Sequence, residues 1–238
     1  MLSGREPWLP AELATAGREN LDPAHVARYD AKEDAHAADE VAMLFGLGLP
    51  GRPIVVDLGA GTGQFTLEVA KTASRVVAVD VSPVMLERLA AKLERSRLTN
   101  VECVLAGFLS YEHAGPPADL VYSRFALHHL PDFWKALALS RIARLLGPGG
   151  VLRLWDVVYG FDPADAVARV EQWLHDGASH SAAEGWTRAE LEEHVRDEHS
   201  TFTWLLEPMI ARAGFAIERA DYSGDQMFAR YVCRRMPG

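Results

Sequence analysis

The sequence "VVDLGAGTGQF", Val55 to Phe65, places three glycines within five positions directly after a β-branched apolar run. Such a run is typical of a strand that is buried on both faces. Glycines at the end of a strand let a ligand lie almost on the main chain, because they carry no Cβ. The stretch therefore predicts a strand, a tight turn and a helix, with a ligand at the turn. That ligand is either the pyrophosphate of a dinucleotide or another group that needs a bare backbone.

Three polar and spacing features around these glycines separate the two ligand types. The dinucleotide fingerprint GxGxxG needs its third glycine at position 64, but this chain has Gln64 there and its third glycine is Gly63. Asp80 ends the next predicted strand, where a carboxylate accepts hydrogen bonds from both hydroxyls of a ribose, each worth roughly 1.5–3 kcal/mol. Asp57, just before the glycines, would repel a pyrophosphate and would suit an ammonium or sulfonium group. Together these features point away from a dinucleotide.

Short apolar segments and helical segments alternate on both sides of the glycine turn. We expect strands at 54–58, 75–81, 100–106, 118–124 and 151–158, helices at 64–74, 82–96 and 132–146, and two closing strands at 215–223 and 227–235. This alternation predicts an α/β fold: a Rossmann-like, doubly wound, mostly parallel seven-stranded sheet with helices on both faces. Such sheets bind ligands beyond the carboxyl ends of their strands, where the strand order reverses.

The alternation is interrupted at two places, which suggest the organisation of the chain. Residues 1–50 are expected to form an N-terminal lead-in and a helical flap, with a helix at 23–46. Residues 51–238 are expected to form the sheet domain. After the fifth strand, helices at 163–175 and 187–197 form a helical insert at about 158–200 that we expect to cover the ligand edge as a lid.

Composition limits the classes of partner. The chain has 238 residues, 49% of them apolar, which is enough for one sizeable core. Its formal net charge of −9 weighs against binding a nucleic acid. No apolar run approaches the roughly 20 residues of a membrane span, and the start lacks the apolar core of a signal peptide. We therefore expect a cytoplasmic protein without a membrane partner, in which Cys103 and Cys233 are buried free thiols.

From Ile54 to Val157 the chain resembles the class I S-adenosylmethionine-dependent methyltransferases. The resemblance rests on four ordered segments, "VVDLGAGTGQF", "VVAVDVSPVML", "ADLVYSRFALHHLPD" and "IARLLGPGGVLRL". It implies a methyltransferase whose cofactor is S-adenosyl-L-methionine, so that residues 51–238 form the cofactor-binding domain and the insert a substrate cap. The chain departs from the family at Gly107, where the family often has an acidic residue that binds the adenine amino group.

The resemblance also implies roles for individual residues. The glycine turn would line the methionine and the ribose, and Asp57 would hold the loop or approach the amino group. Asp80 would bind the ribose hydroxyls. Side chains on both sides of the adenine, the end of the fourth strand and the N-terminal flap would complete the cofactor site. The cofactor residues expected in this way are Asp57, Gly59, Ala60, Gly61, Gly63, Asp80, Val81, Met85, Gly107, Phe108, Ser123, Arg124 and Tyr29.

Methyl transfer is a displacement at a sulfonium methyl, so the protein supplies alignment, water exclusion and, where needed, a base. His128 and His129, which follow the fourth strand, are the candidate catalytic residues, because an imidazole with a pKa of about 6.5 can accept a proton at neutral pH. The alternative is that both histidines only pack. Arg124 is either a partner for a carboxylate or a plain surface arginine.

The sequence narrows the acceptor by elimination. The place after the fourth strand reads "YSRFALHH" and not the Asn/Asp-Pro-Pro-aromatic stretch of enzymes that methylate base amines, and neither cysteine is placed for attack on cytosine. A small-molecule substrate remains. The aromatic residues in and around the insert either wall its pocket or form the insert's own core. His180, His194 and His199 are scattered, with no carboxylate or cysteine at ligand spacing, so we expect no metal.

Two other functions stay open at this point. One is a non-catalytic S-adenosylmethionine-binding module that regulates a partner, and the other is a nicotinamide-dependent oxidoreductase. The sequence does not name the acceptor atom, and it leaves the oligomeric state open, with a homodimer among the options.

Overall fold

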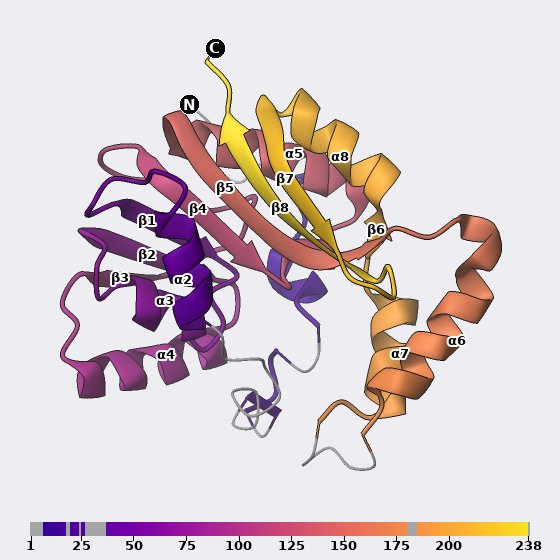
Figure 1. Cartoon of the computed structure of the whole chain (residues 1–238). Coiled ribbons are helices and arrows are strands. Elements are labelled where there is room, and N and C mark those ends of the chain that lie inside the picture. Colours follow the sequence, from indigo (N-terminus) through magenta and orange to yellow (C-terminus); the bar gives the residue numbers. More distant parts are fainter. Residues whose placement is uncertain (1–6, 18–19, 24, 27–36, 180–184, 238) are drawn as a thin grey trace.

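The computed structural model describes residues 7–17, 20–23, 25–26, 37–179 and 185–237. Its centre is a mixed sheet in the order β3-β2-β1-β4-β5-β8-β7, and the short β6 pairs with β5 outside this path (Figure 1). The strands are β1 (Ile54–Leu58), β2 (Arg75–Asp80), β3 (Val101–Leu105), β4 (Ala118–Arg124), β5 (Leu146–Tyr159), β6 (Thr201–Phe202), β7 (Phe215–Tyr222) and β8 (Phe228–Arg235). The predicted Rossmann-like α/β fold is thereby confirmed.

The strand order reverses between β1 and β4, which lie side by side and run parallel. Strand β2 is parallel to both β1 and β3, and β5 is parallel to β4. Strand β8 is antiparallel to both β5 and β7. Ligands of open parallel sheets bind at such a reversal, beyond the carboxyl ends of the strands. The loops that follow β1 and β4 therefore mark the expected place of the site.

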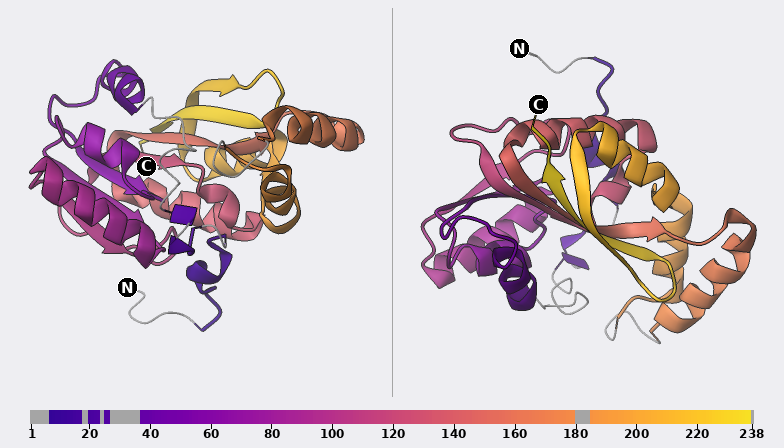
Figure 2. Two further views of the ribbon diagram at one scale, coloured as in Figure 1. Left: turned by 90° about the horizontal axis from the view of Figure 1, so that it is seen from below. Right: turned by 45° about the horizontal axis from the view of Figure 1, so that its top comes forward.

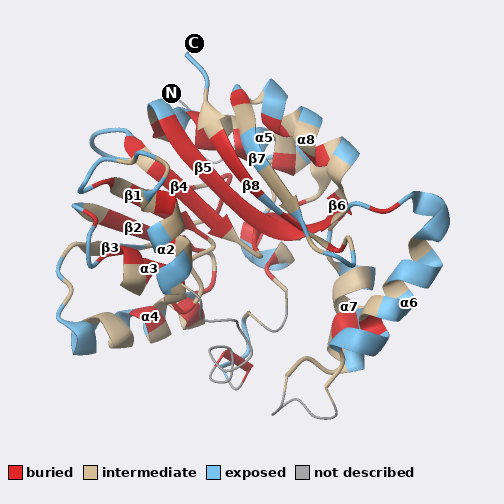
Figure 3. Ribbon diagram, in the orientation of Figure 1, coloured by how far each residue is buried: buried red, intermediate tan, exposed pale blue. Residues whose placement is uncertain are grey.

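Helices cover both faces of the sheet. They are α2 (Ala37–Phe45), α3 (Gln64–Val69), α4 (Pro83–Ser96), α5 (Asp132–Leu145), α6 (Ala166–Gly177), α7 (Arg188–Asp197) and α8 (Thr203–Arg212), with 3-10 turns η1 (Glu12–Thr15), η2 (Leu127–His129) and η3 (Pro163–Asp165). One apolar cluster joins α2 and α3 to one face, and a larger cluster joins α5 and α8 to the other. The central strands lie between these layers and are almost wholly buried (Figure 3).

Local sequence signals explain where several helices begin. Ser82 caps α4, since its Oγ accepts a hydrogen bond from the Met85 amide at 3.2 Å, and proline follows at the first helical position. Thr187 and Glu190 form a capping box at the start of α7. Both starts agree with the positions expected from the sequence to within one residue.

Other boundaries differ from the expectation. Helix α3 ends at Val69 rather than at residue 74, because a turn follows it. Strand β5 begins at Leu146 rather than at residue 151. The helix expected over 23–46 is described only in part, and α2 packs into the core beside α3 rather than over the ligand edge. Cys103 is exposed, contrary to the expectation, because β3 is an outer strand of the sheet, whereas Cys233 is buried.

The insert after β5 projects beyond one end of the sheet, with α6 and α7 packed against each other (Figure 2). Leu174 of α6 and Leu191 of α7 are the buried apolar residues of these two helices. The chain returns through β6, in which Thr201 and Phe202 pair with the end of β5. Across the described part of the chain, none of the helices has the length and apolar character that a bilayer span requires.

Candidate active site

The glycine turn is bare for two separate physical reasons. Gly59, Gly61 and Gly63 have φ of 75°, 53° and 85°, a region that residues with a Cβ rarely adopt. A Cβ at Gly59 would come within 2.3 Å of the Cβ of Ala126, and one at Gly63 within 2.1 Å of a Leu89 methyl. Gly63 therefore allows α4 to pack against the turn, while Gly59 and Gly61 line a small pocket.

Asp80 closes the other side of this small pocket and organises the turn. One carboxylate oxygen accepts the Gly61 amide at 2.8 Å, and the other accepts the Ser82 amide at 2.8 Å. Burial raises the pKa of Asp80 above its ordinary value, although these backbone hydrogen bonds favour the charged form. Each oxygen keeps a lone pair, so the carboxylate has capacity for further donors at the pocket.

Glu12 is a residue of this pocket that the sequence did not indicate. It reaches in from η1, and its carboxylate oxygens accept the Leu109 amide at 2.9 Å and the Ser110 hydroxyl at 2.7 Å. A Cβ placed on Gly107 would lie 2.4 Å from Glu12 Oε1, so the carboxylate of Glu12 occupies the space beside Gly107. The N-terminal segment thus supplies an acidic group at the place where the chain departs from the family pattern.

The small pocket brings together most of the expected cofactor residues. Its lining includes Gly59, Gly61, Asp80, Val81, Met85, Gly107, Phe108 and Arg124. Its volume of about 70 Å³ is below the 300–1,000 Å³ usual for ligand sites. The buried carboxylates, the two bare glycines and the apolar side chains fit the nucleoside part of S-adenosylmethionine.

The remaining expected residues lie elsewhere. Ala60, Gly63 and Ser123 do not line the small pocket, and Tyr29 lies outside the described residues. Asp57 is buried below the turn, where its carboxylate accepts the Thr66 hydroxyl at 2.6 Å. Burial raises the pKa of Asp57 to about 7, against the lowering effect of this hydrogen bond. The contact joins β1 to α3, so Asp57 holds the loop rather than lining the pocket.

A second cavity of about 990 Å³ adjoins the small pocket. Four residues line both spaces, namely Asn20, Arg124, Phe125 and His129. Phe125 stands at this junction with a φ of 50°, unusual for an aromatic residue, and its amide donates to the Trp155 carbonyl at 2.8 Å. The walls of the cavity come from the sheet edge, the insert, the β7–β8 turn and the N-terminal segment.

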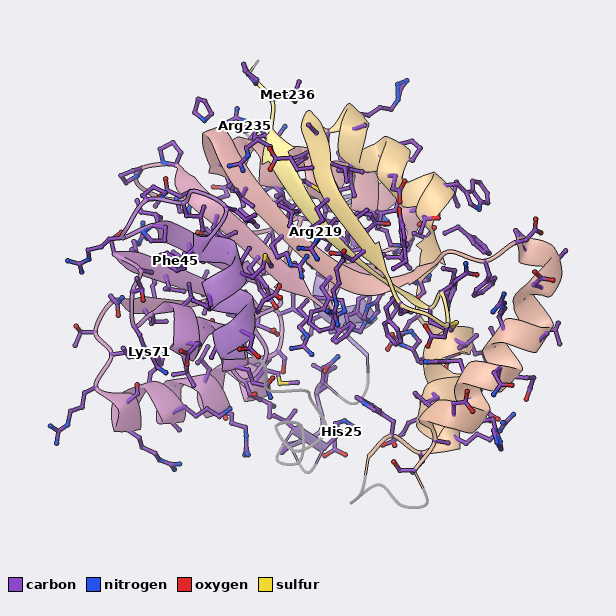
Figure 4. The ribbon with its side chains drawn as sticks, viewed as in Figure 1. His25, Phe45, Lys71, Arg219, Arg235 and Met236 are labelled. Atoms are coloured by element: carbon purple, nitrogen blue, oxygen red, sulfur yellow. The ribbon has the colours of Figure 1, made fainter. Side chains whose placement is uncertain are left out.

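The N-terminal segment and the insert meet at the wall of this large cavity. His25 points toward α7 (Figure 4), where its Nδ1 lies 3.8 Å from a carboxylate oxygen of Glu190. Its ring also lies 5.6 Å from the ring of Trp186. These contacts connect two segments that are far apart in sequence and that both line the cavity.

The aromatic residues divide between the cavity wall and the insert's own packing. Trp155, Trp173 and Trp186 line the large cavity, whereas Tyr159 and Phe161 pack with each other and with Phe202. Trp155 lies in a row across three strands, because β4 pairs it with Arg124 and β8 pairs it with Arg230. The two guanidinium groups stand 4.0 Å and 3.7 Å from its ring.

His128 is buried and held by carboxylates at both ring nitrogens. Asp156 contacts its Nδ1 and accepts its backbone amide at 3.0 Å, while Glu198 Oε2 lies 3.0 Å from its Nε2. Burial by itself lowers the pKa of His128, but the charges and hydrogen bonds of Asp156 and Glu198 outweigh it and raise the pKa to about 10. In this arrangement His128 carries a proton at neutral pH.

His129 has the opposite electrostatic setting. Burial, followed by the charge of His128, lowers its pKa to about 3, so the ring is neutral at pH 7. Its Nε2 lies 3.3 Å from the Asn20 amide nitrogen, and its Nδ1 lies 3.9 Å from Glu198 Oε1. Since His129 lines both spaces, it is nearer to their junction than His128, which lines only the large cavity.

Three residues of this histidine cluster were missed by sequence reasoning: Asp156, His194 and Glu198. One signal was available, because Asp156 interrupts the apolar run "VLRLWDVV", where a buried charge requires a partner. His194 and Glu198 lie on and just after α7 and contact each other. No local spacing relates them to His128, since only the return of the chain from the insert brings them to η2, where the His199 amide donates to the His128 carbonyl at 3.0 Å.

Comparison with known proteins supports the family and the fold. Residues 55–150 match a family model described as a methyltransferase domain. The chain is 27% identical over 168 residues to an uncharacterized methyltransferase of Geobacillus kaustophilus, covering 65% of this chain and 75% of that protein. It is 34% identical over 128 residues to a trans-aconitate 2-methyltransferase of Methylobacterium radiotolerans, covering 53% and 46% of the two chains.

Solved structures show the same fold. An S-adenosylmethionine-dependent methyltransferase from Mesorhizobium loti aligns with a TM-score of 0.61 at 21% identity, over 85% of this chain and all of that one. The matched segment of the family model holds the glycine turn, Asp80 and the strands on both sides of the reversal in strand order. The chain thus belongs to the class I S-adenosylmethionine-dependent methyltransferases, enzymes whose cofactor is S-adenosyl-L-methionine.

Proposed function

We propose that this methyltransferase acts on a small molecule that binds in the large cavity. The observation that carries the proposal is the contact between the two spaces: a cavity of about 990 Å³ joins the cofactor pocket through Asn20, Arg124, Phe125 and His129. That volume lies at the upper end of the range for small-molecule sites. With the family established as one of enzymes, the regulatory module and the oxidoreductase are set aside.

The cofactor-binding roles follow from the pocket lining. Asp80 would bind the ribose hydroxyls with the lone pairs that the Gly61 and Ser82 amides leave available. Val81, Met85 and Phe108 would contact the adenine, and Glu12 would accept its amino group in place of an acidic residue at Gly107. Arg124, which stands at the junction, would meet a carboxylate of the cofactor or of the acceptor. When bound, S-adenosyl-L-methionine supplies an electrophilic methyl group that the acceptor atom approaches in line.

The rest of the chain's contribution is alignment and exclusion of water. Helices α6 and α7 would act as the substrate cap, and the segment that carries Glu12 and Asn20 would act as the flap over the cofactor. Trp155 and Trp173 offer flat apolar walls to the acceptor. We assign His128 and His129 to contact with the acceptor in the large cavity, with His129 at its junction with the small pocket, without requiring either ring to act as a general base.

Two further observations support a small molecule over a macromolecule. The formal net charge of −9 disfavours a nucleic acid, and the cavity lies between the insert, the sheet edge and the N-terminal segment. The related protein from Methylobacterium radiotolerans is named for a small organic acid.

The test is to follow the methyl group. The purified enzyme is incubated with methyl-tritiated S-adenosylmethionine and a cell extract divided into small molecules, protein and nucleic acid. We expect label to be transferred only in the small-molecule fraction, and Asp80→Asn to abolish it. Transfer to protein or nucleic acid, with none to small molecules, would contradict the proposal.

A further inference from the structure

Three side chains at the wall of the large cavity present metal-binding atoms to one another. These are His128, His129 and Glu198, each of which offers one nitrogen or oxygen, and the three atoms lie within 4.8 Å of each other. His128 and His129 come from η2, whereas Glu198 comes from the segment after α7. We propose that His128 Nε2, His129 Nδ1 and the carboxylate of Glu198 bind a divalent first-row transition-metal ion, such as zinc.

Two of the three proposed ligands, His128 and Glu198, have a second group that sets their orientation. Asp156 contacts Nδ1 of His128, which directs Nε2 toward Glu198 at 3.0 Å. His194 contacts the carboxylate of Glu198. Metal-binding histidines usually donate their other ring nitrogen to a carboxylate, and metal-binding carboxylates are themselves hydrogen-bonded. The cluster therefore has both the ligands of a metal site and the outer groups that hold two of them.

His129 supplies the least satisfied atom of the cluster. Its Nδ1 is buried and, among the described residues, has no hydrogen-bond partner. Coordination through Nδ1 places the imidazole proton on Nε2, 3.3 Å from the Asn20 amide nitrogen. The Asn20 amide must then turn to present its oxygen and give up the 2.7 Å bond from its nitrogen to the Ala16 carbonyl. This rearrangement of one side chain is the structural change that the proposal requires.

Charge and donor type indicate which ion fits. Asp156 and Glu198 bring two negative charges to the cluster, which a divalent cation neutralises while the imidazoles bind as neutral ligands. Two imidazoles and one carboxylate suit zinc or iron(II), whereas magnesium and calcium prefer oxygen ligands. Three protein ligands leave at least one coordination position for water or substrate.

The position of the cluster suggests what the open coordination site meets. All three ligands line the large cavity, and His129 also lines the cofactor pocket. A substrate oxygen or nitrogen bound to the ion would therefore lie close to the junction of the two spaces. The alternative is that the cluster is a set of ion pairs, with a protonated His128 between Asp156 and Glu198, and that it binds no metal.

Metal titration separates the two readings without requiring a known acceptor. The full-length protein is stripped with a chelator and titrated with Co²⁺, followed by visible d–d absorption, and with Zn²⁺ by calorimetry. We expect one ion per chain. Glu198→Gln and His129→Gln should each weaken Zn²⁺ binding by more than about 100-fold, and His194→Ala by about 10–100-fold.

Glu193→Gln is the matched control, because Glu193 is a carboxylate of α7 that lines the same cavity outside the cluster. It should bind Zn²⁺ like the unchanged protein. Titration of every variant with S-adenosylhomocysteine reports whether the fold and the cofactor site persist, so failure of the metal site is distinguished from failure of the proposed function. The proposal would be overturned if the unchanged protein bound no stoichiometric metal ion, or if Glu198→Gln and His129→Gln still bound Zn²⁺ tightly. It would also be overturned if Glu193→Gln lost as much Zn²⁺ affinity as they do.

Discussion

The role of Asp80 is open to a direct test by Asp80→Asn. Its two carboxylate oxygens accept the Gly61 and Ser82 amides, each at 2.8 Å, and it lines the cofactor pocket. Asparagine keeps the size of the side chain but turns one acceptor into a donor and removes the charge. Two charge-assisted hydrogen bonds to the ribose are then lost or weakened, at about 1.5–3 kcal/mol each. We expect S-adenosylhomocysteine to bind about 10²–10⁴-fold more weakly.

Isothermal titration with S-adenosylhomocysteine measures this effect. The substitution also removes an acceptor from one backbone amide, so a control must lose a comparable contact away from the pocket. Asp119→Asn meets this need, because Asp119 accepts the Ile54 amide at 2.8 Å and lies outside both spaces. We expect Asp119→Asn to bind the ligand normally. If Asp80→Asn bound it as tightly as the unchanged protein, or if both variants lost affinity equally, the ribose assignment would be refuted.

Three further changes test the glycine turn, the N-terminal contact and the buried carboxylate. Gly63→Ala should destabilise the protein by more than Gly149→Ala, as measured by denaturant unfolding. Both glycines have a positive φ, which costs a residue with a Cβ roughly 1–2 kcal/mol. Only the Cβ at position 63 would also clash, because it would lie 2.1 Å from Leu89. Glu12→Gln should weaken S-adenosylhomocysteine binding with little loss of melting temperature, and equal affinity would exclude Glu12 from the adenine contact. The raised pKa of Asp57, about 7, means that its contribution to stability is present at low pH and is lost as pH rises from about 4 through 7. Relative to Asp57→Asn, the unchanged protein should therefore lose roughly 2.5 kcal/mol of unfolding free energy between pH 5 and pH 8, and a pH-independent difference would contradict this.

The N-terminal segment supplies part of the walls of both the small pocket and the large cavity, and the insert supplies part of the walls of the large cavity. The doubly wound sheet by itself supplies only an open edge beyond β1 and β4. In this chain Glu12 and Asn20 line the small pocket at that edge, while Glu198 and residues of α7 line the large cavity. The His25–Glu190 contact joins the two segments. The specificity of the enzyme for its acceptor is therefore expected to depend on these two segments rather than on the sheet.

Much of the fold followed from local patterns. The β-branched run before Gly59, the Ser82–Pro83 helix start and the turn after β1 each reflect an interaction between residues that are close in sequence. Periodicity and turn chemistry act over the same short range. Boundaries were less well determined: β5 begins earlier than its apolar run, because its first residues join the sheet through pairing with Ala118 of β4.

The sequence by itself determined the alternation of strands and helices, the glycine turn and the carboxylate that faces it, because these depend on backbone conformation and on neighbours in the chain. Only the tertiary structure decided that Glu12 lies beside Gly107, that Asp57 bonds to Thr66 rather than lining the pocket, and that Glu198 meets His128. Those contacts join segments whose separation along the chain carries no periodic signal. The contacts of Glu12 and Glu198 form only when the N-terminal segment and the insert fold back over the edge of the sheet, and the Asp57–Thr66 contact forms when α3 packs against β1.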